Sequence, residues 1–223
     1  MTTVPALSAA AKARTRVRIV DDDPSVVRAL TAFLEMDDWQ VVAYGSGKAF
    51  LADPQTAPGC VVLDVRMPEM TGIEVQEEMR RRGMTLPIIF LSAHGDIELA
   101  VDAVKRGAKT FLVKPPKPGK LLAEIEAAVR EDIEAKRSEE ERAELLSLWN
   151  TLTAAEKEVA QLVAKGLTNS AIAEVLGVAE RTVRSHKAEV YGKLDVENAV
   201  ETGDFIRELG DGARGDAPAG GRP

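Results

Sequence analysis

Apolar residues occur in short runs through the first half of the chain, and amphipathic segments separate the runs. Each run has the length of a strand and is too short for a helix of ordinary length. The runs are VRIV (17–20), QVVAY (40–44), CVVL (60–63), PIIFL (87–91) and TFLV (110–113). Helical spacing of apolar residues is found at 25–36, 47–52, 72–82, 96–106 and 118–135. Strands that alternate with helices predict a five-stranded parallel sheet covered by helices on both faces.

A different pattern begins near residue 131. Residues from about 131 to 144 are rich in charge and almost free of large apolar side chains, which predicts a helical linker at 131–147, with a disordered tether as the alternative. Residues 210–223, rich in Gly and Pro, and residues 1–15 are predicted to be disordered. The pattern therefore predicts an α/β domain at 16–130 and an all-α domain at 148–209. The short helices predicted in the second domain lie at about 153–165, 169–176, 180–193 and 197–209.

Polar side chains follow four of the five predicted strands. They are Asp21, Asp22 and Asp23 after the first strand, Asp64 after the third, Ser92 after the fourth and Lys114 after the fifth. Because the carboxyl ends of parallel strands meet at one edge of the sheet, we expect these side chains to converge. Clustered carboxylates repel one another, and Mg²⁺, which prefers carboxylate and water oxygens, relieves that repulsion.

A magnesium ion beside a carboxylate, a lysine and a hydroxyl is suited to phosphoryl transfer. The metal neutralises charge on the moving group, while Lys114 and Ser92 hold its remaining oxygens. Asp64 lies at the centre and is the candidate nucleophile, which would form an aspartyl-phosphate. An alternative is that the acids at 21–23 only cap a helix that begins near Pro24, but this does not account for all four strand ends together.

Residues 16–130 resemble the receiver domain of two-component response regulators, which has a flavodoxin-like α/β fold. The resemblance rests on the segments IVDDD, VVLDVRMPEMTG, IIFLSAHGD and TFLVKP, which occur in the family's order and at its usual spacings. It implies that Asp64 accepts phosphate from a histidine kinase. It also implies that Asp21, Asp22, Asp64 and the backbone carbonyl of Arg66 bind Mg²⁺.

The same resemblance assigns roles to residues near the ends of the last two strands. Ser92 and Lys114 are implied to contact the phosphoryl group, and Phe111 holds the family's aromatic switch position. The peptide bond between Lys114 and Pro115 is implied to be cis. Pro116 departs from the family pattern, in which an aromatic or other large apolar residue often follows Lys-Pro, so the start of the next helix can differ here.

Two further residues follow predicted site residues closely in the sequence, and one of them has an alternative role. Arg66 lies two residues after Asp64, and His94 lies two residues after Ser92. Both can overhang the phosphoryl site and set the lifetime of the phosphate. The alternative is that His94 is an exposed loop residue.

The second domain has the features of a helix-turn-helix. Thr153 and Glu156 form a capping-box pattern, and Gly166 and Gly177 are placed to end the first two helices. The net charge of −7 argues against nucleic-acid binding by the chain as a whole, so the charge has to be considered locally. Phosphate contacts need only a local basic face. The third helix supplies one, because it carries Arg181, Arg184, Lys187 and Lys193 against the single acid Glu189 within 181–193.

The third helix also presents a face suited to reading bases. Arg184, Ser185 and Ala188 share a side of the helix that excludes the apolar Val183 and Val190. From this face Arg184 could pair with guanine, and the methyl group of Ala188 could touch thymine. The residues better placed for phosphates are Arg181, Thr182 and Lys187.

Residues 148–209 resemble the LuxR/FixJ-type helix-turn-helix, through LTAAEKEVAQLVAKGLTNSAIAEVLGV, RTVRSH and KL. Joined to a receiver, this domain resembles the FixJ/NarL class of response regulators. The resemblance implies that the last helix mediates dimer contacts, for which the candidate residues are Asn198, Phe205, Ile206 and Leu209. Ala179 departs from the family, which usually has a serine N-cap before the recognition helix.

These features predict a transcriptional response regulator that is not an enzyme. A sensor histidine kinase would phosphorylate Asp64, and the phosphorylated homodimer would bind promoter DNA. One alternative is a phosphohydrolase that forms an aspartyl-phosphate, although such enzymes usually carry Asp-x-Asp after the first strand. Another is a receiver whose last helices bind protein.

The same residues bear on location and cofactor class. No apolar run approaches the roughly 20 residues of a membrane span, and residues 1–15 lack a secretory signal, so we expect a cytoplasmic protein that does not bind membranes. Cys60 is the only cysteine, which excludes an internal disulfide and a cysteine-based zinc site.

Overall fold

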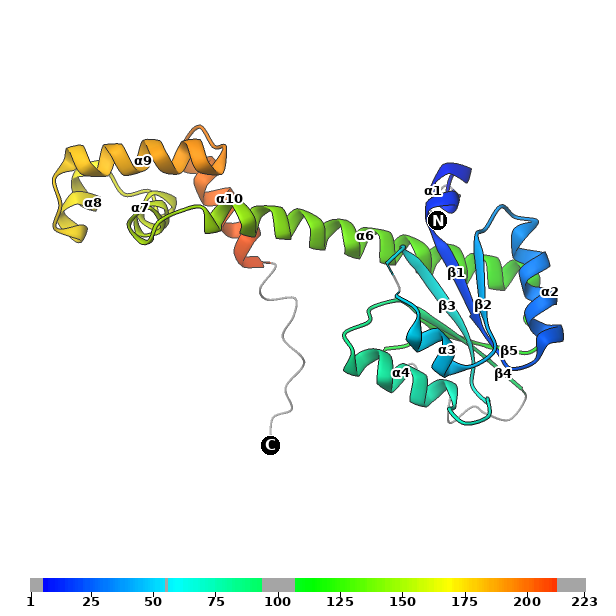
Figure 1. The fold of residues 1–223 in the computed structure, drawn as a ribbon. Helices are drawn as coiled ribbons and strands as arrows, with labels where there is room; N and C mark the ends of the chain where they lie inside the picture. Colours follow the sequence, from blue (N-terminus) through cyan, green and yellow to red (C-terminus); the bar gives the residue numbers. More distant parts are fainter. Residues whose placement is uncertain (1–5, 55, 94–106, 212–223) are drawn as a thin grey trace. The chain divides into compact units, whose positions relative to one another are not determined.

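Five parallel strands form one sheet, in the order β2-β1-β3-β4-β5 (Figure 1). The computed structural model describes residues 6–54, 56–93 and 107–211. Val20 of β1 lies opposite Leu63 of β3, so the residues that follow these two strands meet at one edge of the sheet. The predicted parallel sheet is confirmed. Its strands are β1 (Arg16–Val20), β2 (Val41–Tyr44), β3 (Gly59–Asp64), β4 (Ile88–Ser92) and β5 (Thr110–Val113).

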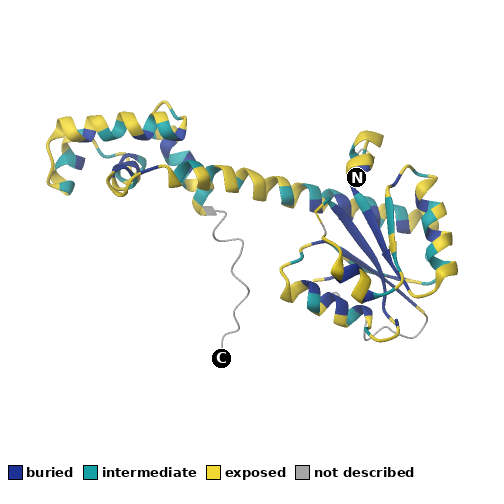
Figure 2. Cartoon of the chain, in the orientation of Figure 1, coloured by how far each residue is buried: buried dark blue, intermediate teal, exposed yellow. Residues whose placement is uncertain are grey.

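Helices cover both faces of this sheet (Figure 1). On β3, Cys60 and Val62 belong to the core cluster that includes residues of α2 and α6, while Val61 and Leu63 belong to the cluster formed with α3 and α4. All four residues are buried, which explains why this strand is apolar without alternation (Figure 2). The helix predicted at 96–106 lies outside the described residues. The covering helices are α2 (Pro24–Glu35), α3 (Gly47–Ala52), α4 (Gly72–Arg81) and α6 (Pro118–Asn150).

The N-terminal segment contains a short helix, α1 (Ala9–Arg14), where the sequence predicts disorder. The side chain of Lys12 is buried, and its Nζ lies 2.8 Å from Asp37 Oδ2 and 4.8 Å from the centroid of the Trp39 ring. Leu7, just before the helix, packs against the core cluster that contains Trp39. The prediction of a disordered tail is therefore wrong for this helix, because contacts with distant residues hold it in place.

The chain divides into two compact units, residues 1–136 and 137–223. α6 runs through the division and contains the whole of the stretch predicted as a helical linker, 131–147. The first part of that stretch belongs to the N-terminal unit, because Asp132 is buried and accepts a hydrogen bond from the backbone N–H of Gly59 at 2.7 Å.

The C-terminal unit is all helical, as the sequence predicts. Val159, Val163, Ile172 and Val183 form one buried cluster, and a second cluster includes Phe205. In the part of this unit that the structure describes, the helices after α6 are α7 (Ala154–Ala164), α8 (Asn169–Leu176), α9 (Glu180–Leu194) and α10 (Ala199–Asp211).

α10 extends to Asp211, two residues into the segment predicted as a disordered tail, and residues 212–223 lie outside the described part. Within the described ranges, no helix is both long enough and apolar enough to cross a bilayer.

Candidate functional site

Three carboxylates meet at the carboxyl edge of the sheet. Asp21 and Asp22 follow β1, and Asp64 is the last residue of the neighbouring strand β3. One carboxylate oxygen from each of the three lies within 4.8 Å of the others. Asp21 and Asp64 are buried and Asp22 is exposed, so the cluster opens to solvent on one side. The predicted convergence of these acids is observed.

Lys114 joins the cluster from the end of β5. Its Nζ lies 2.6 Å from Asp21 Oδ2 and 2.9 Å from Asp64 Oδ1, so one ammonium bridges two carboxylates. The backbone N–H of Lys114 donates to the Ser92 carbonyl at 2.7 Å, and the peptide bond to Pro115 is cis, as predicted. Burial lowers the pKa of Lys114, but its hydrogen bonds to Asp21 and Asp64, together with the charges of these two acids, hold that pKa above its ordinary value.

The surroundings of the Asp64 carboxyl group disfavour its charged form. Burial raises its pKa above the ordinary value, and the charge of Asp21 raises it further. The hydrogen bond and charge of Lys114, together with a hydrogen bond from the backbone N–H of Arg66, oppose this rise without cancelling it. Among the described residues, the ion pairs given for these three carboxylates come from the one ammonium of Lys114, so the site has an excess of negative charge that a cation would relieve. Its donors are all hard oxygens, a set that fits Mg²⁺.

The third acid of the run has a different role. Asp23 is the N-cap of α2, and its Oδ1 accepts a hydrogen bond from the backbone N–H of Ser25 at 2.7 Å. The backbone N–H of Asp23 in turn donates to Asp21 Oδ1 at 2.9 Å and so orients the Asp21 carboxylate. The capping interpretation therefore holds for Asp23, while Asp21 and Asp22 belong to the acidic cluster.

The remaining predicted residues of this edge differ in burial and in their contacts. Ser92 is the last residue of β4, is buried, and donates to the Ala93 carbonyl at 3.2 Å. Phe111 lies on β5 and packs against the core cluster on the α3 and α4 side of the sheet. Arg66 is exposed, and His94 lies outside the described residues.

Gly72 is a residue whose importance the sequence reasoning missed. It is the first residue of α4, and a Cβ atom at this position would lie 2.2 Å from the backbone oxygen of Asp64. Its own N–H donates to the Val65 carbonyl at 2.9 Å. Thr71 and Glu74 form a capping box that fixes the start of the same helix. The backbone of Asp64 is thus held against the beginning of α4, which only glycine allows.

The second candidate surface is the outer side of α9. Val183, Val190 and Leu194 are buried, so the opposite side of the helix faces solvent. Lys187 is partly buried, with its Nζ 5.4 Å from the centroid of the Tyr191 ring. Ala179 is the N-cap and makes no side-chain capping bond, as its identity predicts. The predicted DNA contacts that are exposed are Arg181, Thr182, Arg184, Ser185 and Ala188.

An ion pair between buried Glu156 and partly exposed Lys193 joins α9 to α7. Lys193 Nζ lies 2.8 and 2.7 Å from the two carboxylate oxygens of Glu156, and Glu156 also accepts from the backbone N–H of Thr153. These hydrogen bonds hold the pKa of Glu156 below its ordinary value, with the Lys193 bond as the largest cause. The sequence identified Glu156 as a capping residue only, because its contact with Lys193 joins residues far apart in the chain.

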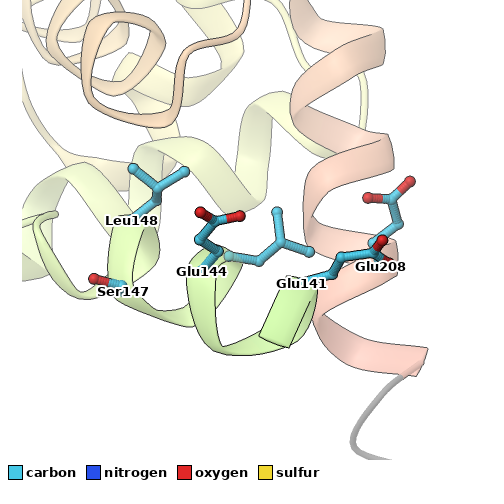
Figure 3. A pocket seen from close by; sticks show the side chains of 6 residues that line it. Glu141, Glu144, Ser147, Leu148 and Glu208 are labelled. Carbon is cyan, nitrogen blue, oxygen red and sulfur yellow. The ribbon is translucent and has the colours of Figure 1, made fainter. Parts of the chain in front are cut away.

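An acidic hollow lies between the end of α6 and α10, with a volume of about 440 Å³. Leu145 and Leu148 are among the residues that line it, and so are the three acids Glu141, Glu144 and Glu208 (Figure 3). Carboxylates at this density repel DNA phosphates. The basic side of α9 is therefore the better nucleic-acid interface within this unit.

The predicted dimer residues of α10 are mostly turned into their own unit. Phe205 is buried in the core cluster that includes Val190, while Ile206 and Leu209 are partly buried and pack against the same cluster. Asn198 is exposed and caps the start of the helix through its Oδ1. Phe205 therefore stabilises its own unit, and contacts with a second copy would fall to exposed residues of α10.

Comparison with known proteins matches each unit to a described family. Residues 17–126 match the response regulator receiver domain, and residues 150–205 match the bacterial regulatory proteins of the luxR family. The chain is 39% identical over 191 residues to the transcriptional regulatory protein TdiR of Thauera aromatica, covering 85% of this chain and 83% of TdiR. It is 36% identical over 186 residues to the transcriptional regulatory protein FixJ of Azorhizobium caulinodans, covering 83% and 88% of the two chains.

Solved structures give the same result. The response regulator StyR matches with a TM-score of 0.82 and 37% identity, covering 87% of this chain and 99% of StyR. Full-length FixJ from B. japonicum matches with a TM-score of 0.55 and 32% identity, covering 89% of this chain and 98% of FixJ. Both similarities extend over the two units, so they concern the combination of domains as well as each fold.

Proposed function

Because the chain belongs to the two-component response regulators that join a receiver domain to a LuxR-type DNA-binding domain, we propose that Asp64 is its phosphoryl acceptor. The donor is a sensor histidine kinase, and phosphorylation promotes binding of α9 to promoter DNA. The observation that carries the proposal is the bridge of Lys114 between Asp21 and Asp64. It puts an ammonium beside a nucleophile, at the position where a transferred phosphoryl group would develop negative charge.

The chemical step forms one bond and breaks another. An oxygen of the Asp64 carboxylate attacks the phosphorus of the kinase phosphohistidine, the phosphorus–nitrogen bond breaks, and the imidazole leaves with its electron pair. The product is an acyl phosphate on Asp64. Lys114 is 2.9 Å from Asp64 Oδ1 and can turn one of its N–H groups to the new phosphoryl oxygens.

A divalent cation fits the same place. Asp21, Asp22 and Asp64, with the Arg66 carbonyl, would hold Mg²⁺, which when bound neutralises charge on the phosphoryl oxygens. The fit rests on three converging carboxylates, two of which share the ammonium of Lys114. The role of the Arg66 carbonyl comes from the family pattern.

Phosphorylation must then be passed to the rest of the receiver. The phosphoryl group adds about −1.5 to −2 charges at Asp64. Ser92 now makes a bond of 3.2 Å to a neighbouring carbonyl, a weak bond that it can exchange for a phosphoryl oxygen. Phe111 is assigned as the switch residue. It follows the movement of Ser92 toward the phosphoryl group and so changes the surface around β5. The altered face favours a homodimer, whose two α9 helices bind paired half-sites in promoter DNA.

On the DNA side, the exposed face of α9 has the residues for both kinds of contact. Arg184, Ser185 and Ala188 are assigned to base edges, and Arg181, Thr182 and Lys187 to phosphates. The three carboxylates of the acidic hollow repel DNA phosphates and so favour binding at α9 over binding at the hollow. Such a role places the protein in the cytoplasm, where promoter DNA is found.

A phosphohydrolase is the rival function, and the arrangement does not favour it. The family of the chain consists of transcriptional regulators, and the proposed nucleophile lies on β3, while Asp-Asp-Asp follows β1. A receiver with a protein-binding output is disfavoured by the match of residues 150–205 to the luxR family.

The experiment is incubation with acetyl phosphate and Mg²⁺, followed by intact-mass and peptide mass spectrometry. We expect an acid-labile adduct of about 80 Da, the mass of the transferred phosphoryl group, on the peptide that contains Asp64. Asp64→Asn should abolish it, whereas Asp38→Asn, the same change at an exposed acid, should not. An adduct elsewhere would refute the assignment of Asp64, and many turnovers of small phosphoesters would instead support the phosphohydrolase.

A further inference from the structure

An acid stands at the start of the helix that carries the DNA-binding face. Glu180 is the first residue of α9 and is exposed, where a carboxylate would be repelled by nearby DNA phosphates. Its Oε1 accepts a hydrogen bond from Arg184 Nη1 at 3.1 Å, one helical turn further on. Exposed ion pairs of this kind contribute little to folding stability, and the favourable interaction of a first-turn acid with the helix dipole does not depend on Arg184, so stability does not explain the bond between the two side chains.

We propose that Glu180 is a positioning residue for base recognition, which holds the guanidinium of Arg184 in the orientation that reads guanine. The inference rests on the proposed binding of DNA by α9. Glu180 acts through Arg184 and need not touch DNA itself. It would determine the base preference at the single position that Arg184 reads.

The chemistry of the guanidinium supports this role. Arginine has five N–H donors in a planar fork, and guanine is recognised through two parallel donors to its O6 and N7. A carboxylate on Nη1 leaves the edge formed by Nε and Nη2 free for guanine. It also restricts a long side chain that is 60% exposed and would otherwise sample many rotamers. Preorganisation of this kind improves discrimination, because less rotamer freedom is lost when the correct base is bound.

The neighbouring residues allow this arrangement. Arg184 and Ala188 follow Glu180 at intervals of four residues and so form one stripe, and both are exposed. Glu189 is the other acid within α9, and within the described part of the chain it makes no ion pair. It therefore serves as a matched control, because its removal changes the charge of the helix equally without releasing Arg184.

The test is selection from a randomised duplex DNA library with the acetyl phosphate-treated full chain. Wild type, Glu180→Ala, Glu189→Ala and Arg184→Ala are compared, and dissociation constants are then measured for the selected duplex and its single-base variants. Both Glu→Ala variants should bind all duplexes more tightly, because each removes one negative charge. Glu180→Ala and Arg184→Ala alone should lose preference for guanine at one common position, by about fivefold or more.

Two further measurements separate positioning from a structural role. The double variant Glu180→Ala, Arg184→Ala should lose no more preference for guanine than Arg184→Ala alone, because Glu180 acts only through Arg184. Glu180→Gln, which keeps a weaker acceptor, should retain part of the preference and guards against misfolding of the alanine variant. The inference is overturned if Glu180→Ala keeps the wild-type base preference, or if Glu189→Ala loses as much preference for guanine as Glu180→Ala. Neither result affects the proposal that α9 binds DNA. A wild-type chain that selects no duplex overturns the DNA-binding proposal, and the inference with it.

Discussion

Replacing Gly72 by alanine tests whether the backbone of Asp64 is held in place by the start of α4. The added Cβ would lie 2.2 Å from the Asp64 carbonyl oxygen and 3.1 Å from Phe90, whereas real Cβ contacts shorter than 3.0 Å essentially never occur. The first of these contacts must lengthen by at least 0.8 Å. The added Cβ atom and the Asp64 carbonyl oxygen are both rigidly attached to backbone, so α4 or the end of β3 has to move.

Two opposing effects set the size of the change. Overpacking in a well-packed region costs about 1–3 kcal/mol, and a clash with backbone lies toward the upper end of that range. Alanine is the better helix former by roughly 1 kcal/mol in a helix interior, and by less at the first helical residue, where Gly72 lies. The steric effect wins. We expect a net loss of roughly 1–2 kcal/mol, a decrease in Tm of about 4–10 °C for a unit of this size.

The functional effect follows from the displaced nucleophile. A shift of about 1 Å in a reacting group can cost on the order of 100-fold in rate, so phosphorylation by acetyl phosphate should slow by about 10-fold to 100-fold. The assay is the initial rate of formation of the Asp64 adduct by intact-mass spectrometry, at a temperature where both proteins are folded. Gly45→Ala is the control, because a Cβ there meets nothing within 4 Å. A variant at Gly72 with wild-type Tm and wild-type phosphorylation rate would refute the steric argument.

Three other outcomes are expected. Lys12→Met should lower the free energy of unfolding, measured by chemical denaturation, by about 1–2 kcal/mol. Lys12 is buried, but solvent weakens its ion pair because Asp37 is half-exposed. Arg14→Met, the same change at an exposed position, should leave the denaturation curve unaltered. Glu156→Gln should destabilise the chain at neutral pH. Because folding lowers the pKa of Glu156, its contribution is present above the unfolded pKa of about 4.3 and is lost as pH falls through the folded value, so denaturation curves of wild type and variant should converge in acid. Asp22→Asn should raise the Mg²⁺ concentration needed for half-maximal phosphorylation by acetyl phosphate, while an unchanged metal titration would remove Asp22 from the ligand set.

The predictions from sequence were strongest where a local pattern determines a structure. The apolar runs located all five strands, and the residues at their carboxyl ends identified Asp21, Asp64 and Lys114 as neighbours. This worked because parallel connectivity brings those ends together whatever the details of packing. The buried and exposed sides of α9 likewise followed from helical periodicity, with Val183 and Val190 inside and Arg184 outside.

What the sequence alone determined, then, was the order of elements, the acidic edge of the sheet and the basic face of α9. Tertiary structure decided the features that depend on contacts between distant residues. The sequence predicted disorder before β1, but Lys12 forms an ion pair with Asp37, contacts the ring of Trp39 and is part of a helix. Periodicity placed Phe205 on a helix without saying that its own unit covers it. Position 72 requires glycine because the carbonyl of Asp64 lies against it in the folded chain. The sequence does not reveal this requirement, because steric exclusion acts between atoms that are close in space and leaves no periodic pattern along the chain.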